Sequence, residues 1–431
     1  MTLRRLIVLL ALAAAMAAAQ PRTSAPAPLE PGKQVKTYTL PPEKLAQAIA
    51  YAHARDWLHF IGFAYGVAVL AGLLAWRVAP RFRNWAQTIS RRRIVQAYIF
   101  TPLLLLTVDI LELPVSLYDQ RLSLKYQQSV QGWGSWFWDW SKGELIEFAV
   151  LGFVAWMLYG AIRRSARRWW FYFWLSSIPI VLFLLFIAPV VIEPLFYQFE
   201  PLASTQPALV AQIEKVVARG GLAIPPGRIY EMKASEKLTS LNAYVAGIGA
   251  SKRVVVWDTT LRKMTTGQTL FVFGHEMGHY VLGHIWLSIG GICALLLAGL
   301  FAAYHAMRRM IARWGARWNI LGLDDWAALP LLMLAFAVLS FAAEPATSSF
   351  SRMLEHHADI YGLEVIHGIV PDASQAAAQA FQILGEVSLS DPNPSPFIEF
   401  WLYDHPSVSD RVRFAAEYDP WGKGIPPQYV R

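Results

Sequence analysis

Long apolar runs alternate with short polar segments along most of the chain. Six of these runs are long enough, or nearly so, to cross a bilayer, which takes about 20 residues in a helix. They cover residues 59–79, 94–118, 145–162, 170–197, 284–306 and 327–349. A shorter apolar run, Leu6–Ala19, follows two arginines and predicts a signal peptide or a short first transmembrane helix in residues 1–19. The pattern therefore predicts a mainly α, polytopic membrane helical bundle.

The spacing of these runs divides the chain into domains. Residues 20–58 are expected to be a linker and N-terminal segment, and residues 59–197 an N-terminal membrane domain of four spans. Residues 198–431 form a second domain that includes the spans at 284–306 and 327–349. Its first part has a helical period at 205–219 and then short β-prone runs. These runs are Arg228–Met232, Ala243–Ile248 and Arg253–Trp257, so a small α+β unit is expected.

Composition and charge support a membrane location. The chain is 55% hydrophobic and 16% charged, whereas soluble domains carry about 25% charged residues. The lipid bilayer is therefore an expected partner. The net charge of +8 comes from arginines in the loops between spans, which argues against a nucleic-acid partner. The only cysteine, Cys293, excludes an intramolecular disulfide and a zinc site made of thiolates.

The basic loops also predict an orientation. If the spans alternate, the arginine-rich loops at 81–93, 163–168 and 308–317 all lie on one side of the membrane. Basic loops are typical of the cytoplasmic side. The polar stretch 198–283 would then face outward.

Candidate chemistry begins with residues 271–284, which read FVFGHEMGHYVLGH and contain the pattern HExxH. Helix positions i and i+4 share a face, so His275 and His279 can bind one metal ion. Zinc accepts two imidazoles in tetrahedral geometry and, in catalytic sites, keeps a position open for water. Glu276 can act as general base toward that water. Chance occurrence on a buried helix is the alternative, and the next motif argues against it.

Two histidines need a third protein ligand, and residues 351–359 read SRMLEHHAD. Helical spacing places Glu355 and Asp359 on one face. We expect Glu355 to complete the ligand set and Asp359 to accept the N–H of a ligating imidazole. The alternative, that both carboxylates are solvated surface charges, is disfavoured beside an HExxH pattern. Structural or surface roles are expected for the histidines that lie off the ligand face, His284, His356 and His357.

These motifs resemble those of the CAAX prenyl protease 1 type of integral-membrane zinc metalloproteases. The resemblance runs from about residue 59 to 415 and includes IAPVVIEPLF, LNAYVAGIGASKRVVVWDTTL, HEMGH, SRMLEHHAD and HPSVSDR, in that order. It implies a zincin-like metalloprotease domain in residues 198–431 and helices that enclose a large water-filled chamber. It also implies one zinc per chain on His275, His279 and Glu355, with Glu276 as catalytic base. In the same family, residues at the positions of Asn242, Ala243 and Tyr244 hold the substrate backbone, and those of His405 and Arg411 lie near the cleaved carbonyl or the substrate's end.

The function expected from this resemblance is zinc-dependent endopeptidase activity on membrane-associated or unfolded polypeptides. Eukaryotic members have a full first helix and a catalytic domain on the cytosolic side, and this chain differs in both respects. We therefore expect a bacterial inner-membrane enzyme with its catalytic domain facing the periplasm, where substrates need not be prenylated.

Two other functions are compatible with parts of the pattern. A heat-shock type quality-control membrane protease would use the same chemistry on damaged membrane proteins. A transporter or binding protein would need a structural zinc closed by a fourth protein ligand, and Glu276 would then have no role. The sequence does not specify the oligomeric state.

Overall fold

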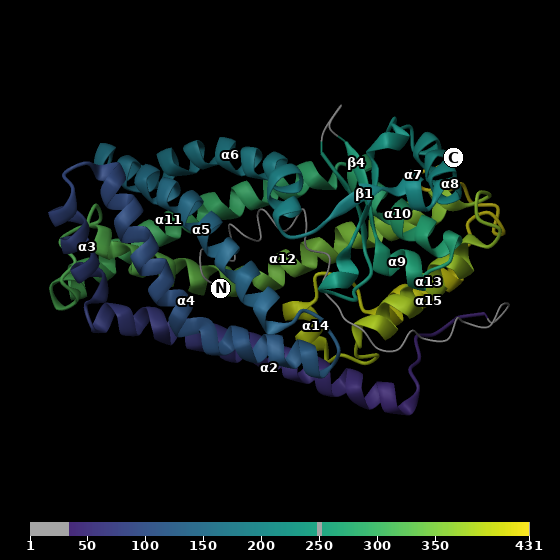
Figure 1. Cartoon of the computed structure of the whole chain (residues 1–431), viewed down its shortest axis with the longest axis horizontal. Coiled ribbons are helices and arrows are strands. Elements are labelled where there is room, and N and C mark those ends of the chain that lie inside the picture. The colour runs from purple at the N-terminus through teal and green to yellow at the C-terminus, as the bar shows by residue number, and fades with distance from the viewer. Residues whose placement is uncertain (1–33, 248–251, 431) are drawn as a thin grey trace.

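The computed structural model describes residues 34–247 and 252–430 as an elongated helical molecule with a small sheet near one end (Figure 1). Among these residues, six helices are long and apolar enough to cross a membrane. The mainly α membrane fold expected from the sequence is thus confirmed. The expected signal peptide or first helix in residues 1–19 lies outside the described residues.

The long helices match the apolar runs but extend beyond them. They are α2 (Pro42–Ala75), α4 (Arg93–Lys125), α5 (Trp133–Arg164), α6 (Trp169–Ile187), α11 (His284–Trp318) and α12 (Leu329–Ile366). After α6, a π-helical turn η1 (Ala188–Ile192) and the 3-10 turn η2 (Glu193–Leu195) continue the span. Helix α2 begins inside the segment expected to be a linker, because hydropathy marks only the apolar part of a helix and Pro42 is compatible with a first helical turn.

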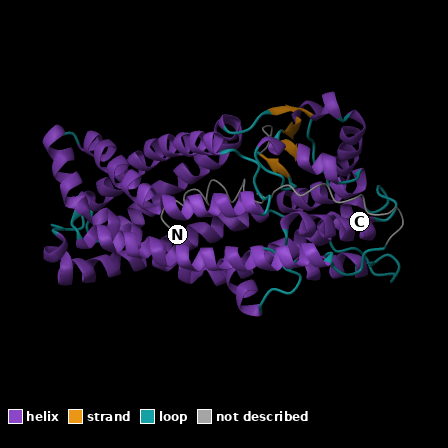
Figure 2. Ribbon diagram, turned by 60° about the horizontal axis from the view of Figure 1, so that its bottom comes forward, coloured by secondary structure: helices purple, strands orange, loops and turns teal. Residues whose placement is uncertain are grey.

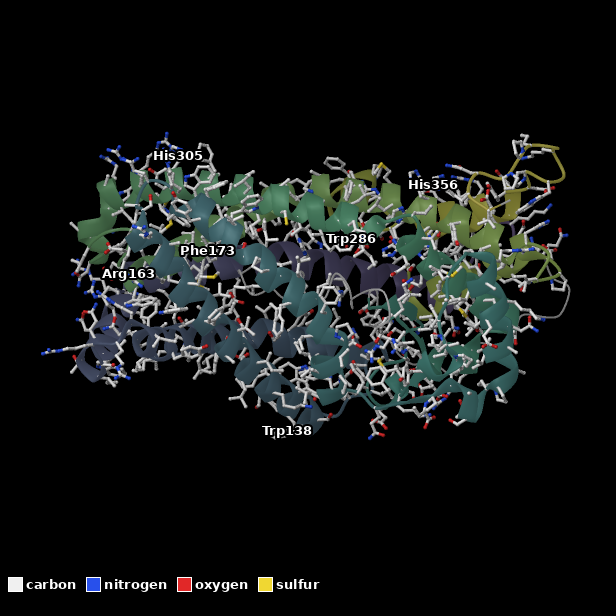
Figure 3. All side chains as sticks on the ribbon, turned by 90° about the horizontal axis from the view of Figure 1, so that it is seen from above. Trp138, Arg163, Phe173, Trp286, His305 and His356 are labelled. Carbon is white, nitrogen blue, oxygen red and sulfur yellow. The ribbon has the colours of Figure 1, made fainter. Side chains whose placement is uncertain are left out.

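The arginine-rich segments meet at one end of the bundle. Two of them were expected to be loops but lie mostly in helices, in the short helix α3 (Val78–Ile89) and in the last turns of α11. Arg77 Nε donates to the carbonyl oxygen of Arg317 at 2.8 Å. The buried guanidinium of Arg83 lies 2.6 Å from Asp325 Oδ2, just before the 3-10 turn η6 (Trp326–Ala328). Figure 3 shows Arg163 at this end and His356 toward the other.

A four-stranded sheet lies near the opposite end, where the orange strands stand out in Figure 2. The strands are β1 (Phe199–Pro201), β2 (Ile229–Met232), β3 (Ala243–Ala246) and β4 (Arg253–Trp257), in the order β1-β2-β4-β3. Strand β4 pairs parallel with β2 and antiparallel with β3, and β1 pairs antiparallel with β2. Strand β3 is therefore an edge strand of the sheet.

Helices complete this domain. The longer ones are α8 (Pro207–Arg219), α10 (Thr266–Val281), α13 (Ala373–Ser388) and α15 (Val408–Glu417). The shorter elements are α7 (Leu202–Thr205), η3 (Pro226–Arg228), η4 (Ala234–Glu236), α9 (Asp258–Lys263) and α14 (Pro396–Leu402).

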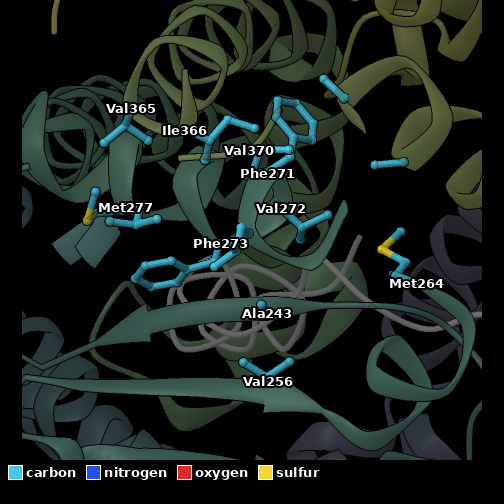
Figure 4. Close-up of a cluster of buried hydrophobic side chains, with 14 of the residues drawn as sticks. Ala243, Val256, Met264, Phe271, Val272, Phe273, Met277, Val365, Ile366 and Val370 are labelled. Carbon is cyan, nitrogen blue, oxygen red and sulfur yellow. The ribbon is translucent and has the colours of Figure 1, made fainter. Parts of the chain in front are cut away.

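The core of the domain packs α10 between the sheet and the end of α12 (Figure 4). Phe273 and Met277 of α10 are fully buried, as are Val256 of β4 and Val365 of α12. Helix α10 and helix α12 approach very closely at Gly362, where an added Cβ would lie 2.9 Å from the backbone nitrogen of His275. This close approach brings the carboxylates of α12 to the histidines of α10.

Candidate metal centre and active site

Helix α10 presents the two histidines of the HExxH pattern on one face. Its first turn is fixed by a capping box, in which Thr265 Oγ1 accepts from the Gln268 amide and Gln268 Oε1 accepts from the Thr265 amide. Such a cap stabilises a helix by about 1 kcal/mol. Two turns further along, the Nε2 atoms of His275 and His279 lie 3.2 Å apart.

Glu355 of α12 completes a three-residue cluster. Its Oε2 lies 3.2 Å from His275 Nε2, and its Oε1 lies 3.3 Å from His279 Nε2. A tetrahedral zinc with bonds of about 2.0–2.1 Å sets its ligand atoms about 3.3 Å apart. The donor types and their spacing therefore fit zinc.

Asp359 and Arg411 lie behind the cluster. Asp359 Oδ1 is 2.8 Å from His275 Nδ1, on the side of the ring away from Glu355. Arg411 donates two hydrogen bonds to the same carboxylate, from Nε at 3.0 Å and from Nη2 at 2.6 Å. Because Asp359 is almost fully buried, this bidentate pair fixes the orientation of its carboxylate. Arg411 Nη2 is 3.7 Å from Glu355 Oε2, too far for a hydrogen bond, so Arg411 acts on the three-residue cluster mainly by holding Asp359.

His284 lies outside the three-residue cluster, as its expected place off the ligand face implies, but it lies closer to the cluster than a continuous helix would allow. Its Nδ1 is 3.1 Å from Nδ1 of His279, on the side of that ring away from Glu355. The expectation assumed one continuous helix, whereas α10 ends at Val281 and a new helix begins at His284. His356 and His357 do lie outside the three-residue cluster, as expected.

Glu276 and His405 flank the cluster. Burial raises the pKa of the Glu276 carboxyl, which suits a general base that must also release its proton. His405 Nε2 lies 3.1 Å from Glu355 Oε2, and its Nδ1 lies 2.7 Å from Asp404 Oδ1. Burial alone would lower the pKa of His405, but the charges of Glu355 and Asp404 outweigh burial and raise it well above its usual range. Both carboxylates therefore favour the protonated form of His405.

Two cavities, of about 220 and 510 Å³, meet at this centre, and Asn242, Glu276 and His405 line both. The smaller cavity runs between η1 and the start of α11 and is largely apolar, with Val181, Leu185 and Ile289 in its wall. The larger cavity carries charged side chains. They include Arg55, Asp56, Asp391 and Asp404.

The segment Asn242–Tyr244 forms the start of the edge strand. The backbone of Asn242 is fixed on both sides by Thr260, whose Oγ1 accepts from the Asn242 amide at 2.7 Å and donates to its carbonyl at 2.9 Å. Ala243 is fully buried, and Tyr244 lines the smaller cavity with its hydroxyl 2.5 Å from Glu193. Of these three, Asn242 alone reaches both cavities.

The chain matches known proteins in sequence and in fold over most of its length. Residues 203–419 match the model of peptidase family M48, and residues 24–198 match the N-terminal domain of CAAX prenyl proteases, described as five membrane helices. The chain is 35% identical to "Uncharacterized metalloprotease YhfN" of Bacillus subtilis (strain 168), over 87% of this chain and 86% of that protein. It is 24% identical to "CAAX prenyl protease 1 homolog" of Oryza sativa subsp. japonica, over 88% of each. The crystal structure of S. mikatae Ste24p superposes with a TM-score of 0.74 at 21% identity, over 88% of this chain and 89% of that one, and so has the same fold.

Proposed function

Because this chain belongs to peptidase family M48 and carries the membrane domain of CAAX prenyl proteases, we propose that it cleaves polypeptides at one zinc ion bound by His275, His279 and Glu355. The chain is an integral-membrane metalloendopeptidase, and the identity of the metal and of its ligands is the proposal. The observation that carries it is the spacing of the donor groups. The two imidazole Nε2 atoms lie 3.2 Å apart, and each lies 3.2–3.3 Å from one oxygen of Glu355, which fits a tetrahedral ion. A bound zinc ion polarises the scissile carbonyl and makes water more acidic.

The side chains around the ion have separate tasks. Glu276 takes a proton from the attacking water and passes it to the leaving amine. His405 in its protonated form, which Glu355 and Asp404 favour, donates a hydrogen bond to the oxygen that becomes negatively charged in the transition state. Asp359 holds the His275 ring, and Arg411 holds Asp359, so both act through the ligand.

The substrate backbone is proposed to lie along β3. An edge strand offers unpaired amide and carbonyl groups to which an extended peptide can add. Asn242 stands where the two cavities meet, so its side-chain amide is available to the peptide beside the scissile bond. Residues on one side of that bond would enter the apolar cavity, and residues on the other side the charged one.

The other two functions fit less well. The matched N-terminal domain is that of CAAX prenyl proteases, which disfavours a heat-shock type enzyme. A structural zinc would need a fourth protein ligand, and among the described residues the cluster contains three. We do not assume prenylated substrates.

We further propose that the catalytic domain faces the periplasm of a bacterial inner membrane. The arginine-rich loops lie at the end of the bundle opposite the sheet, and basic loops favour the cytoplasm. Reporter fusions in the loop after α11, at residues 319–325, and at the C-terminus test this. Phosphatase activity at the C-terminus and none in the loop is expected, and the reverse pattern would contradict the orientation.

The function is tested by cleavage of a quenched fluorescent peptide library, with zinc content measured in the same preparations. Glu276→Gln should retain one zinc and lose cleavage by about 10²–10⁴-fold, because it removes the general base and leaves the ligands. Glu417→Gln, which changes an exposed carboxylate of α15, should cleave like the wild type. Full cleavage by Glu276→Gln, or wild-type protein that binds no zinc, would refute the proposal.

A further inference from the structure

His284 is a buried imidazole that contacts a proposed metal ligand without being a ligand itself. Its side chain is nearly inaccessible to solvent, and its Nδ1 lies 3.1 Å from Nδ1 of His279. The two rings are tilted by 76°, with centroids 5.1 Å apart. The proposed ligand atom of His279 is Nε2, on the far side of that ring from His284.

A break between two helices produces this contact. On a continuous helix, a residue five positions after His279 would be rotated from it by about 140°. Instead, α10 ends at Val281 and Gly283 adopts a left-handed conformation with φ of +72°. A side chain at Gly283 would meet no atom within 4 Å, so the backbone conformation alone requires glycine there. The turn redirects the chain so that His284, the first residue of α11, faces back to His279.

The metal site allows the hydrogen bond only one direction. Zinc takes the Nε2 lone pair of a neutral His279, so the proton of that ring is on Nδ1. Nδ1–H must then donate, and His284 Nδ1 must accept with its own lone pair. The opposite direction would place the proton of His279 on Nε2 and block the ligand position.

We propose that His284 is a positioning residue that accepts the Nδ1 proton of His279 and thereby presents the Nε2 lone pair of His279 to the metal. This inference rests on the proposed zinc site. The two imidazole ligands would then have different hydrogen-bond acceptors at Nδ1. The acceptor for His275 is the carboxylate of Asp359, and the acceptor for His279 is the neutral ring of His284. Loss of such a support typically weakens metal binding by about 10–100-fold.

The test is the zinc affinity of full-length protein in detergent, measured by competition with a fluorescent chelator. His284→Leu fills the space without an acceptor, whereas His284→Asn places Oδ1 where histidine carries Nδ1. We expect the Leu variant to bind zinc about 10-fold more weakly or worse, and the Asn variant to stay within about 3-fold of the wild type. His357→Leu is the matched control, since that ring lies 6.2 Å from His284 and outside the cluster. It should bind zinc normally.

Each result has a definite meaning, and thermal unfolding of the zinc-loaded variants verifies that they fold. Wild-type affinity in the Leu variant would overturn the proposal, because the acceptor would then be dispensable. Equal losses in the Leu and Asn variants would also overturn it, because His284 would then serve only to fill space. Wild-type protein that binds no zinc would refute the proposed function itself, and this outcome is distinguishable because the variants are not needed to observe it.

Discussion

The two histidines of the HExxH pattern depend on the groups that hold their outer nitrogens. Neutral imidazole carries one proton, and a hydrogen bond at Nδ1 decides which nitrogen is free to bind metal. Asp359 makes that contact with His275, and His284 makes it with His279. Arg411 in turn neutralises Asp359 and fixes its orientation.

Asp404 helps to raise the pKa of His405 and so extends the pH range in which His405 is protonated. The pKa of His405 is raised, so its protonated form is present below that pKa and is lost as pH rises through it. Activity that depends on this cation should therefore fall on the alkaline side. Asp404→Asn removes one of the two carboxylates that raise the pKa, so the alkaline limb of kcat/KM should move to lower pH. The Asp404 side chain is 69% exposed, so solvent screens the pair and we expect a shift of less than about one pH unit.

The pH profiles of wild-type and Asp404→Asn protein check this prediction. The acid limb, which reports loss of the Glu276 base as pH falls through its raised pKa, should move little. An unchanged alkaline limb would show that His405 does not act as a cation.

At this scale the sequence indicated the proposed metal ligands more directly than the residues that lie behind them. The i,i+4 spacings were enough to pair His275 with His279 and Glu355 with Asp359, because helical geometry is local. His405 and Arg411 came only from family resemblance, since a loop histidine and a helix arginine carry no spacing signal. His284 was missed, although Gly283 one residue earlier was a signal that the helix could break there.

Among the elements, the turn between α10 and α11 has the most direct effect on the centre. Gly283→Ala should destabilise the protein by about 1 kcal/mol, because alanine disfavours a positive φ. It should also weaken zinc binding, because the turn carries His284 to His279. Gly221→Ala is the matched control, with φ of +69° and no atom within 4 Å of the added Cβ, in the turn after α8. It should lower the melting temperature to a similar degree and leave zinc affinity unchanged, and equal zinc affinity in both variants would contradict the prediction.

Helix α14 sets the position of His405, which lies three residues after the end of the helix at Leu402. Arg352 of α12 donates to the carbonyl of Glu399 at 2.8 Å and to the carbonyl of Tyr403. Because Glu355 lies on the same helix α12, Arg352 links the loop of His405 to the proposed metal ligand. Arg352→Gln should lower kcat by about 10-fold with zinc content unchanged. The reason is that displacement of a catalytic group by about 1 Å is enough to lower the rate substantially.

Steady-state kinetics and zinc analysis test the role of Arg352. Arg413→Gln is a control of the same chemistry on α15, where the side chain is 61% exposed and pairs with Asp410. It should cleave normally. An Arg352→Gln variant with full kcat would show that α14 keeps its place without this arginine.

Helices and strands could be predicted where a few consecutive residues show their hydrophobic period. Strands β2, β3 and β4 and helix α8 lie close to their predicted ranges, because alternation and helical period mark them directly. Strand β1 was not predicted, since three residues, Phe199–Pro201, are too few to show a period. The start of α2 at Pro42 was missed because its first turns are polar.

For the whole molecule, the proposed metal centre would join α10 to α12 and so connect the domain that holds the sheet to a membrane helix. A ligand that binds only the folded state stabilises it, by about 4 kcal/mol at a concentration 1,000 times its dissociation constant. For a domain of this size, removal of zinc by a chelator should therefore lower the melting temperature by on the order of 10 °C, and added zinc should restore it. Glu355→Gln should show a much smaller chelator effect, and an equal effect would place the stabilising ion elsewhere.

We propose that the zinc centre has two imidazoles and one carboxylate and leaves a position open to water. X-ray absorption at the zinc edge of the purified, zinc-loaded protein measures this directly. We expect two imidazole nitrogens and oxygen ligands at about 2.0–2.2 Å, with no sulfur. A third imidazole bound to zinc, from His284 or His405, would contradict it, because the centre would then be closed by protein as a structural site is.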